Sequence, residues 1–110
     1  MNRIRVISTK IPNNVMGSIT GIIEYQNELT IAVKSHNGYI TSQSHWLDSD
    51  TEPNYRDIYN ISVWKSKHDW ERWFKSDIRM EINKNYNQFV RKENHLILTK
   101  RELYNDIPLL

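Results

Sequence analysis

Three tryptophans fall within ten positions of this chain, and amide side chains lie near them in the sequence. Trp64, Trp70 and Trp73 combine large apolar rings with an indole N–H that can donate a hydrogen bond. Asn60 precedes the first of them and Asn83 follows the last, and an amide can orient or polarise a ligand oxygen. This combination suits a pocket or a contact with a partner, but aromatic clusters are also common in the core of a small domain.

The remaining candidates are an additional aromatic ring and a histidine. Phe74 lies four residues after Trp70, so both rings would share one face of a helix and form an apolar wall. His45 lies in a segment with no strongly apolar side, which leaves it available as an acid, a base or a hydrogen-bond donor. The chain contains no G-x-S-x-G motif and no glycine-rich phosphate loop, so hydrolase and nucleotide-binding functions have no support.

Composition narrows the class of protein. A chain of 110 residues fits one domain, residues 1–110. Its 15 basic and 13 acidic residues are interspersed, which does not favour a nucleic-acid partner. The chain has no cysteine, no run of transmembrane length and an N-terminus too polar for a signal peptide, so we expect a cytoplasmic protein that does not bind membranes. The acidic loop from Asp48 to Asn54 lacks the spacing of a calcium loop, and we expect no metal site.

Periodicity predicts six elements in the order strand, helix, strand, strand, helix, strand. Alternation indicates strands, and apolar residues three or four apart indicate helices. Gly17 and Gly21 weaken the first helix and suggest a close approach of another part of the chain or of a ligand. The predicted ranges are Arg3–Thr9, Val15–Lys34, Tyr39–Trp46, Ile58–Trp64, a helix from Lys67 to about Ile82, and His95–Leu103, followed by a tail from Tyr104 to Leu110.

The second helix carries the tryptophans. Ser66 and Asp69 have the spacing of a capping box, which starts the helix near Lys67. One apolar stripe is predicted to be buried, and Trp73 would lie at its edge with its N–H available to a ligand or a water. The stripe consists of Trp70, Phe74, Ile78 and Ile82, and the charged residues on the other faces are Lys67, Glu71, Arg72, Lys75 and Arg79.

The order βαββαβ predicts an α+β, ferredoxin-like fold, in which two helices cover one face of a four-stranded antiparallel sheet. The opposite face would remain bare. A second copy of the chain is the simplest cover for it, so we expect a homodimer.

With these strands and this aromatic helix, the chain resembles the antibiotic biosynthesis monooxygenase family. The resemblance spans roughly Arg3 to Leu103 and is most specific where Trp64, Lys65 and Ser66 end a strand and the aromatic helix follows. It implies a dimeric α+β barrel, with each pocket between the helices and the sheet of one subunit. It also implies oxygen chemistry on an electron-rich ring, without a metal or flavin cofactor bound by the protein.

The resemblance also assigns roles to the candidate residues. Trp73 would contact the ring of an aromatic or polycyclic substrate, Asn60 and Asn83 would orient its oxygen, and further binding contacts would come from Trp64, Trp70, Phe74 and His45. One branch of the family degrades haem. Trp73 matches the tryptophan of that branch, whereas Asn83 stands where its axial histidine falls. Three functions stay open: a cofactor-independent monooxygenase, a non-catalytic dimer that binds a small ligand, and a haem-binding member with an altered site.

Overall fold

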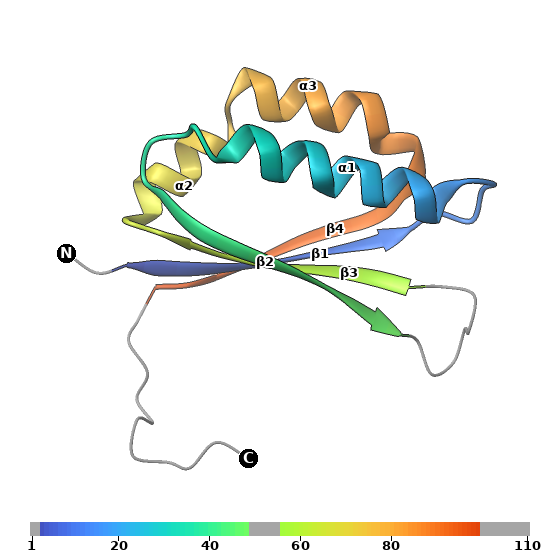
Figure 1. Ribbon diagram of the computed structural model, residues 1–110, viewed down its shortest axis with the longest axis horizontal. Helices are drawn as coiled ribbons and strands as arrows, with labels where there is room; N and C mark the ends of the chain where they lie inside the picture. Colours follow the sequence, from blue (N-terminus) through green and yellow to red (C-terminus); the bar gives the residue numbers. More distant parts are fainter. Residues whose placement is uncertain (1–2, 49–55, 100–110) are drawn as a thin grey trace, which may run out of the picture.

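The computed structural model describes residues 3–48 and 56–99 of the chain, without the side chains of residues 47, 48 and 56. In these residues four strands and three α-helices follow one another, with a single 3₁₀ turn before the last strand (Figure 1). Their bounds are β1 Ile4–Pro12, α1 Ser18–Val33, β2 Tyr39–Asp48, β3 Arg56–Trp64, α2 Lys67–Phe74, α3 Asp77–Tyr86, the 3₁₀ turn η1 Asn87–Phe89, and β4 Val90–Leu98.

The strands form one antiparallel sheet in the order β2-β3-β1-β4, and the helices lie together on one of its faces (Figure 1). This arrangement confirms the predicted α+β, ferredoxin-like fold. Ser8 of β1 lies opposite Asn60 of β3 and His95 of β4, and Lys10 lies opposite Glu93. The register therefore places polar side chains of three strands side by side under the helices.

Strand alternation decides which side chains enter the interior. Along β1 the even positions are buried, and they end with Ser8, Lys10 and Pro12. The predicted first strand stops at Thr9, but the observed strand continues to Pro12, and this extension brings Lys10 to the inner face. The interior is thus partly polar.

Helix α1 confirms the predicted first helix, and both of its glycines have structural reasons. Gly17 precedes the helix with φ of 82°, a conformation that favours glycine. Gly21 faces Phe89, and a Cβ atom there would lie 2.3 Å from the phenyl ring. Close packing of the helix against η1 therefore requires glycine at this position.

The predicted second helix is in fact two helices. Ser66 caps α2 as predicted, by accepting a hydrogen bond from the backbone N–H of Asp69 at 3.1 Å. The prediction of one continuous apolar stripe was wrong, because the chain turns at Lys75 and Ser76, and Ser76 caps a new helix by accepting from the N–H of Arg79. Because of this turn, the residues of α3 do not present the face that they would present in a continuous helix starting at Lys67. As a result Ile78 is 52% exposed and Arg79 is buried.

The last strand begins earlier than predicted. It runs from Val90 to Leu98, because residues 90–98 pair along the whole of β1, whereas the prediction started at His95. The other two strands were predicted with small errors at their ends. The predicted tail from Tyr104 and most of the predicted acidic loop lie outside the described residues.

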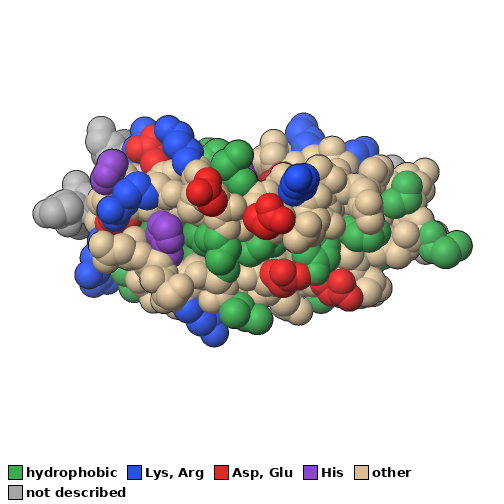
Figure 2. Space-filling view, turned by 90° about the horizontal axis from the view of Figure 1, so that it is seen from above, with side chains coloured by type: hydrophobic (Ala, Val, Ile, Leu, Met, Phe, Trp, Pro, Cys, Tyr) green, Lys and Arg blue, Asp and Glu red, His purple; other side chains and the backbone are tan. Residues whose placement is uncertain are grey.

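The core lies between the helices and the sheet. It contains the three tryptophans together with aliphatic side chains of β1, α1 and α3. Acidic and basic side chains are interspersed over the helical face, with hydrophobic ones between them (Figure 2). None of the helices in the described ranges is long and apolar enough to span a bilayer.

Candidate functional site

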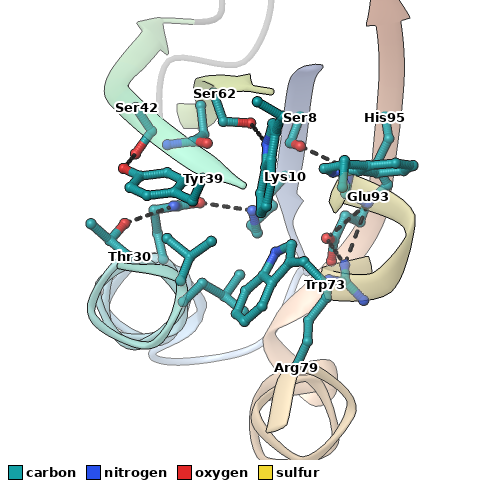
Figure 3. A pocket seen from close by; sticks show the side chains of 16 residues that line it. Ser8, Lys10, Thr30, Tyr39, Ser42, Ser62, Trp73, Arg79, Glu93 and His95 are labelled. Atoms are coloured by element: carbon teal, nitrogen blue, oxygen red, sulfur yellow. Dashed lines mark hydrogen bonds and ion pairs between the residues drawn. The ribbon is translucent and has the colours of Figure 1, made fainter. Parts of the chain in front are cut away.

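A small cavity lies between the helices and the inner face of the sheet, with a volume of about 40 Å³ and a partial opening to solvent. By the same measure of volume one water molecule needs about 10–15 Å³, so the cavity holds about three. Its aromatic walls come from β3 and α2, and its polar groups come from all four strands and from α1 and α3 (Figure 3). The side chains that matter chemically fall into a charged cluster, an aromatic wall and a polar corner.

Lys10 is the most deeply buried charged group of the cavity, with 2% of its surface exposed. Its Nζ atom donates a hydrogen bond of 2.7 Å to Oε1 of Gln26 and lies 5.3 Å from the centre of the Tyr25 ring. Burial lowers the pKa of Lys10 to about 8, with a smaller contribution from Arg79, while Glu93 opposes the shift. The amine is therefore largely protonated at neutral pH, but it gives up its proton more easily than a surface lysine.

Glu93 is the carboxylate of the cluster. Its two oxygens accept hydrogen bonds from Arg79 at 2.8 Å and from the Tyr25 hydroxyl at 2.8 Å, and the Nε2 atom of His95 lies 3.1 Å away. Burial alone would raise the pKa of Glu93, but the His95 hydrogen bond and the cations Lys10 and Arg79 outweigh burial and lower the pKa to about 2. Glu93 is therefore ionised in the folded protein.

His95 connects Glu93 with a serine of the neighbouring strand. Its Nδ1 atom lies 2.8 Å from Oγ of Ser8, and its ring stands edge-on to Phe74 and tilted against Trp70. In the tautomer with its proton on Nε2, His95 donates to the ionised carboxylate, which can only accept, and Nη2 of Arg79 lies 3.4 Å from the same nitrogen. The basic nitrogen is then Nδ1, and a proton can reach it through the Ser8 hydroxyl.

The aromatic wall contains three of the four tryptophans of the chain, namely Trp64, Trp70 and Trp73. Trp64 is 1% exposed and donates from Nε1 to Oγ of Ser62 at 3.0 Å. Trp70 and Trp73 are 8% and 6% exposed, so Trp73 lies inside the core cluster as well as at the cavity. The ring of His36 stands edge-on to Trp73 at 5.3 Å between centroids. These contacts fix the indole planes before any ligand enters.

Asn60 belongs to the polar corner of the cavity. Its Nδ2 atom donates to Oγ of Ser44 at 2.9 Å and to the backbone carbonyl of Gln43 at 3.3 Å. Nearby, the hydroxyl groups of Tyr39 and Ser42 lie 2.7 Å apart. Since Nδ2 is occupied, the Oδ1 atom of Asn60 is the group through which it would meet a ligand.

Four of the seven predicted site residues line the cavity together, namely Asn60, Trp64, Trp70 and Trp73. Phe74 stacks behind Trp70 at 4.9 Å between ring centroids. The other two lie elsewhere. Asn83 donates to the Tyr25 hydroxyl at 2.9 Å and so reaches the charged cluster indirectly, and His45 lines a second pocket of about 120 Å³ between α1 and β2.

Sequence reasoning missed the charged cluster. An extension of the predicted first strand by one residue beyond Thr9 would have placed Lys10 on the same face as Ser8. Glu93 and His95 share the inner face of β4, but the predicted strand began too late to show it. Arg79 was assigned to a charged outer face because the break at Ser76 was not recognised.

The environment of Asn83 does not fit haem. Haem iron is held by an imidazole, thiolate, thioether or phenolate ligand. Asn83 offers an amide, and the neighbouring Tyr25 hydroxyl donates to Glu93, with burial and Glu93 together raising the pKa of the tyrosine. Neither group is a free anionic or imidazole ligand.

Comparison with known proteins gives a likeness at the level of the fold. No family model matches the chain, and no curated protein matches it by sequence. Among solved structures, a variant of SnoaB, a cofactor-independent oxygenase from Streptomyces nogalater, is similar with a TM-score of 0.69 at 10% identity, over 96% of this chain and 99% of that one.

Two further structures give the same result. A conserved protein from Methanosarcina mazei has a TM-score of 0.69 at 17% identity, over 92% of this chain and 95% of its own. An antibiotic biosynthesis monooxygenase has a TM-score of 0.66 at 9% identity, over 90% of this chain and 99% of its own. The ferredoxin-like fold of the single chain, as implied by the sequence resemblance, is therefore confirmed, and chemistry has to be argued from the site.

Proposed function

We propose that this protein is a monooxygenase of the antibiotic biosynthesis monooxygenase kind, which oxidises an electron-rich aromatic or polycyclic small molecule without a protein-bound metal or flavin. The observation that carries the proposal is the placement of Trp64, Trp70 and Trp73 around the same cavity as the Ser8–His95–Glu93 chain. Apolar walls suit a ring, and a buried base suits its deprotonation. The shared fold with a cofactor-independent oxygenase supports this choice of chemistry.

The proposed reaction starts from the keto tautomer of a polycyclic phenol and converts its ring CH₂ group into a carbonyl. The substrate loses one proton to the base, and the resulting carbanion passes one electron to O₂. The substrate radical and superoxide then form a C–O bond, and protonation gives a hydroperoxide. Cleavage of the O–O bond, with loss of the second hydrogen as a proton, yields the ketone and water. All four electrons come from the substrate, so no external reductant is required.

The site residues have distinct roles in this proposal. Ser8 passes the substrate proton to Nδ1 of His95, and Glu93 stabilises the imidazolium that forms. Trp73 contacts the substrate ring, and Asn60 orients its oxygen. Trp64, Trp70 and Phe74 complete the apolar wall, while Asn83 acts through Tyr25 rather than by direct contact.

The proposal predicts O₂ consumption with at least one member of a panel of polycyclic phenols and quinols. Trp73→Phe and His95→Gln should each reduce the rate about tenfold or more, because they remove a ring contact and the base. Phe89→Leu, which alters an aromatic residue of η1 outside the described cavity lining, should leave the rate unchanged. An oxygen electrode gives the rates, and circular dichroism verifies that the variants fold.

Two results would contradict the proposal. The first is O₂ consumption by wild-type protein no faster than in buffer with every member of the panel. The second is a Trp73→Phe variant that loses several kcal/mol of stability and keeps its rate per folded molecule, which would make Trp73 a core residue only.

A non-catalytic ligand-binding protein is the second candidate. The observation that favours it is the small volume of the cavity, about 40 Å³, together with the ion pair of Arg79 and Glu93, whose members already satisfy each other. In this alternative the panel compounds bind without loss of O₂. A binding titration run beside the oxygen electrode separates the two functions.

We further propose that the protein works as a homodimer. The sheet face opposite the helices carries Ile7 with Ile61 and Leu96 on either side of it in register. Leu96 is 57% exposed and Leu98 is 43% exposed. Burial of such a face against a second copy would remove contiguous apolar surface from water.

A further inference from the structure

We propose that the cavity binds its ligand as a monoanion, an aromatic phenolate or enolate whose oxygen accepts a hydrogen bond from Nζ of Lys10. This inference rests on the proposed function in taking the cavity between helices and sheet as the ligand site. It adds the charge state of the ligand and the residue that recognises it. Two observations support the inference, namely an excess of positive charge around the cavity and the contacts of Lys10.

The described cavity lining contains two cations and one anion. Lys10 and Arg79 are positive and Glu93 is negative, which leaves an excess of one positive charge before His95 is counted. The Tyr25 hydroxyl adds no negative charge, since burial and the neighbouring Glu93 raise its pKa. A buried charge without a counter-charge is costly, and a ligand with one negative charge removes that cost.

The hydrogen bonds show which cation is left over. Glu93 is engaged by Arg79, His95 and Tyr25, so its oxygens already have three donors. Lys10, in contrast, donates to the neutral amide of Gln26. An ammonium group has three donors, and the described contacts of Lys10 use one of them with an uncharged acceptor. The lysine is therefore the group whose charge a ligand would compensate.

The surroundings of Lys10 suit an oxygen attached to a ring. In Figure 3 Lys10 lies in the middle of the view, with Tyr39 and Thr30 on one side and His95 and Glu93 on the other. Trp73 lines the same cavity and offers an apolar face. The cavity, with a volume of about 40 Å³, accommodates the oxyanion and the edge of a ring. The remainder of the ligand can extend out of the cavity where it opens to solvent. The same ammonium would stabilise the anion that reacts with O₂.

The test uses a matched pair of oxidised probes, so that binding is measured without turnover. The first probe, 2-hydroxy-1,4-naphthoquinone, is ionised at neutral pH, and the second, 2-methoxy-1,4-naphthoquinone, is neutral and of similar shape. We expect wild-type protein to bind the anion about tenfold or more tightly than the ether, measured by calorimetry. Lys10→Met should abolish this preference. Lys92→Met removes an exposed lysine of β4 and should preserve it.

A thermal-shift measurement on wild-type protein keeps the test valid if Lys10→Met does not fold. The anionic probe should raise the melting temperature and the ether should not, because only a ligand of the folded state stabilises it. Equal binding of the two probes, or an undiminished preference in folded Lys10→Met, would overturn the inference. Inorganic phosphate that stabilises the protein as much as the anionic probe would overturn its aromatic part.

Failure of this inference can be told apart from failure of the proposed function. Anion-selective binding without O₂ consumption across the phenol and quinol panel would support the anion site and contradict the oxygenase. Turnover with equal binding of both naphthoquinones would support the oxygenase and contradict the role of Lys10.

Discussion

Glu93 shows how the interior of this protein tolerates charge. A carboxylate that is 12% exposed pays a desolvation cost, and three donors and two nearby cations offset it. Arg79 stabilises the interior through two contacts. Its guanidinium group donates a hydrogen bond to Glu93 and lies 4.3 Å from the centre of the Phe74 ring. Removal of the carboxylate would leave Arg79 without its ion-pair partner and would also remove the negative charge that acts on Lys10 from a distance.

Glu93→Gln should therefore destabilise the protein at neutral pH by roughly 3 kcal/mol. The pKa of Glu93 is lowered from 4.5 to about 2 in the folded state, so between these values the unfolded chain binds a proton that the folded protein does not. Stability thus rises with pH across this window and is lost as pH falls towards 2. Urea unfolding of wild type and variant from pH 7 to pH 2 measures the difference.

The control is Glu81→Gln, which alters an exposed carboxylate of α3. Its effect on stability at neutral pH should be small, because the side chain is exposed. A difference between Glu93→Gln and wild type that stays constant between pH 5 and pH 2 would show that the carboxylate is not held ionised by its neighbours.

At the scale of single residues, the sequence identified aromatic site residues and missed charged ones. Trp64, Trp70 and Trp73 are large and rarely exposed, so their type alone points to a core or a pocket. Lysine and arginine are mostly exposed, and nothing local marks Lys10 or Arg79 as exceptions. Their burial depends on strand register and on a helix break, and both are decided by tertiary packing.

The break between α2 and α3 determines which side chains of this region reach the cavity. Phe74, Ile78 and Ile82 continue the spacing of Trp70, so periodicity alone predicts one helix. In the folded protein the Ser76 hydroxyl donates to the Trp73 carbonyl at 2.7 Å and accepts from the N–H of Arg79 at 3.3 Å. One side chain therefore ends the first helix and starts the second.

Ser76→Ala should destabilise the protein by about 1 kcal/mol, because the N-cap of α3 and the bond to the end of α2 are both lost. Since α3 carries Arg79, we also expect weaker binding of the anionic naphthoquinone. Ser35→Ala is a matched control, because the Ser35 hydroxyl donates to the Ala32 carbonyl at 3.2 Å at an exposed helix end without capping another helix. Chemical denaturation of both variants gives the comparison, and equal losses would contradict the assigned role of Ser76.

At the scale of the whole molecule, one layer of helices covers one face of the sheet (Figure 1). The charged cluster lies on the covered face together with Trp64, Trp70 and Trp73, so the described part of the site is built from one chain. The opposite face carries Ile7, Ile61 and Leu96 in adjacent positions. These apolar side chains lie on the two central strands, β3 and β1, and on the edge strand β4. They form a surface that association with a second copy of the chain would remove from water.

Dimerisation through this face is tested by Leu96→Asp, since a carboxylate placed among apolar neighbours would be desolvated in the interface. We expect wild-type protein to sediment with twice the mass of the chain, and the variant to dissociate at concentrations about tenfold or more higher than wild type. Ile31→Asp is the control, because Ile31 is 70% exposed on α1, on the helical side of the sheet. Its sedimentation should match wild type. A wild-type protein that stays monomeric at high concentration would contradict the dimer, and it would leave the cavity argument intact because every group in that argument comes from one chain.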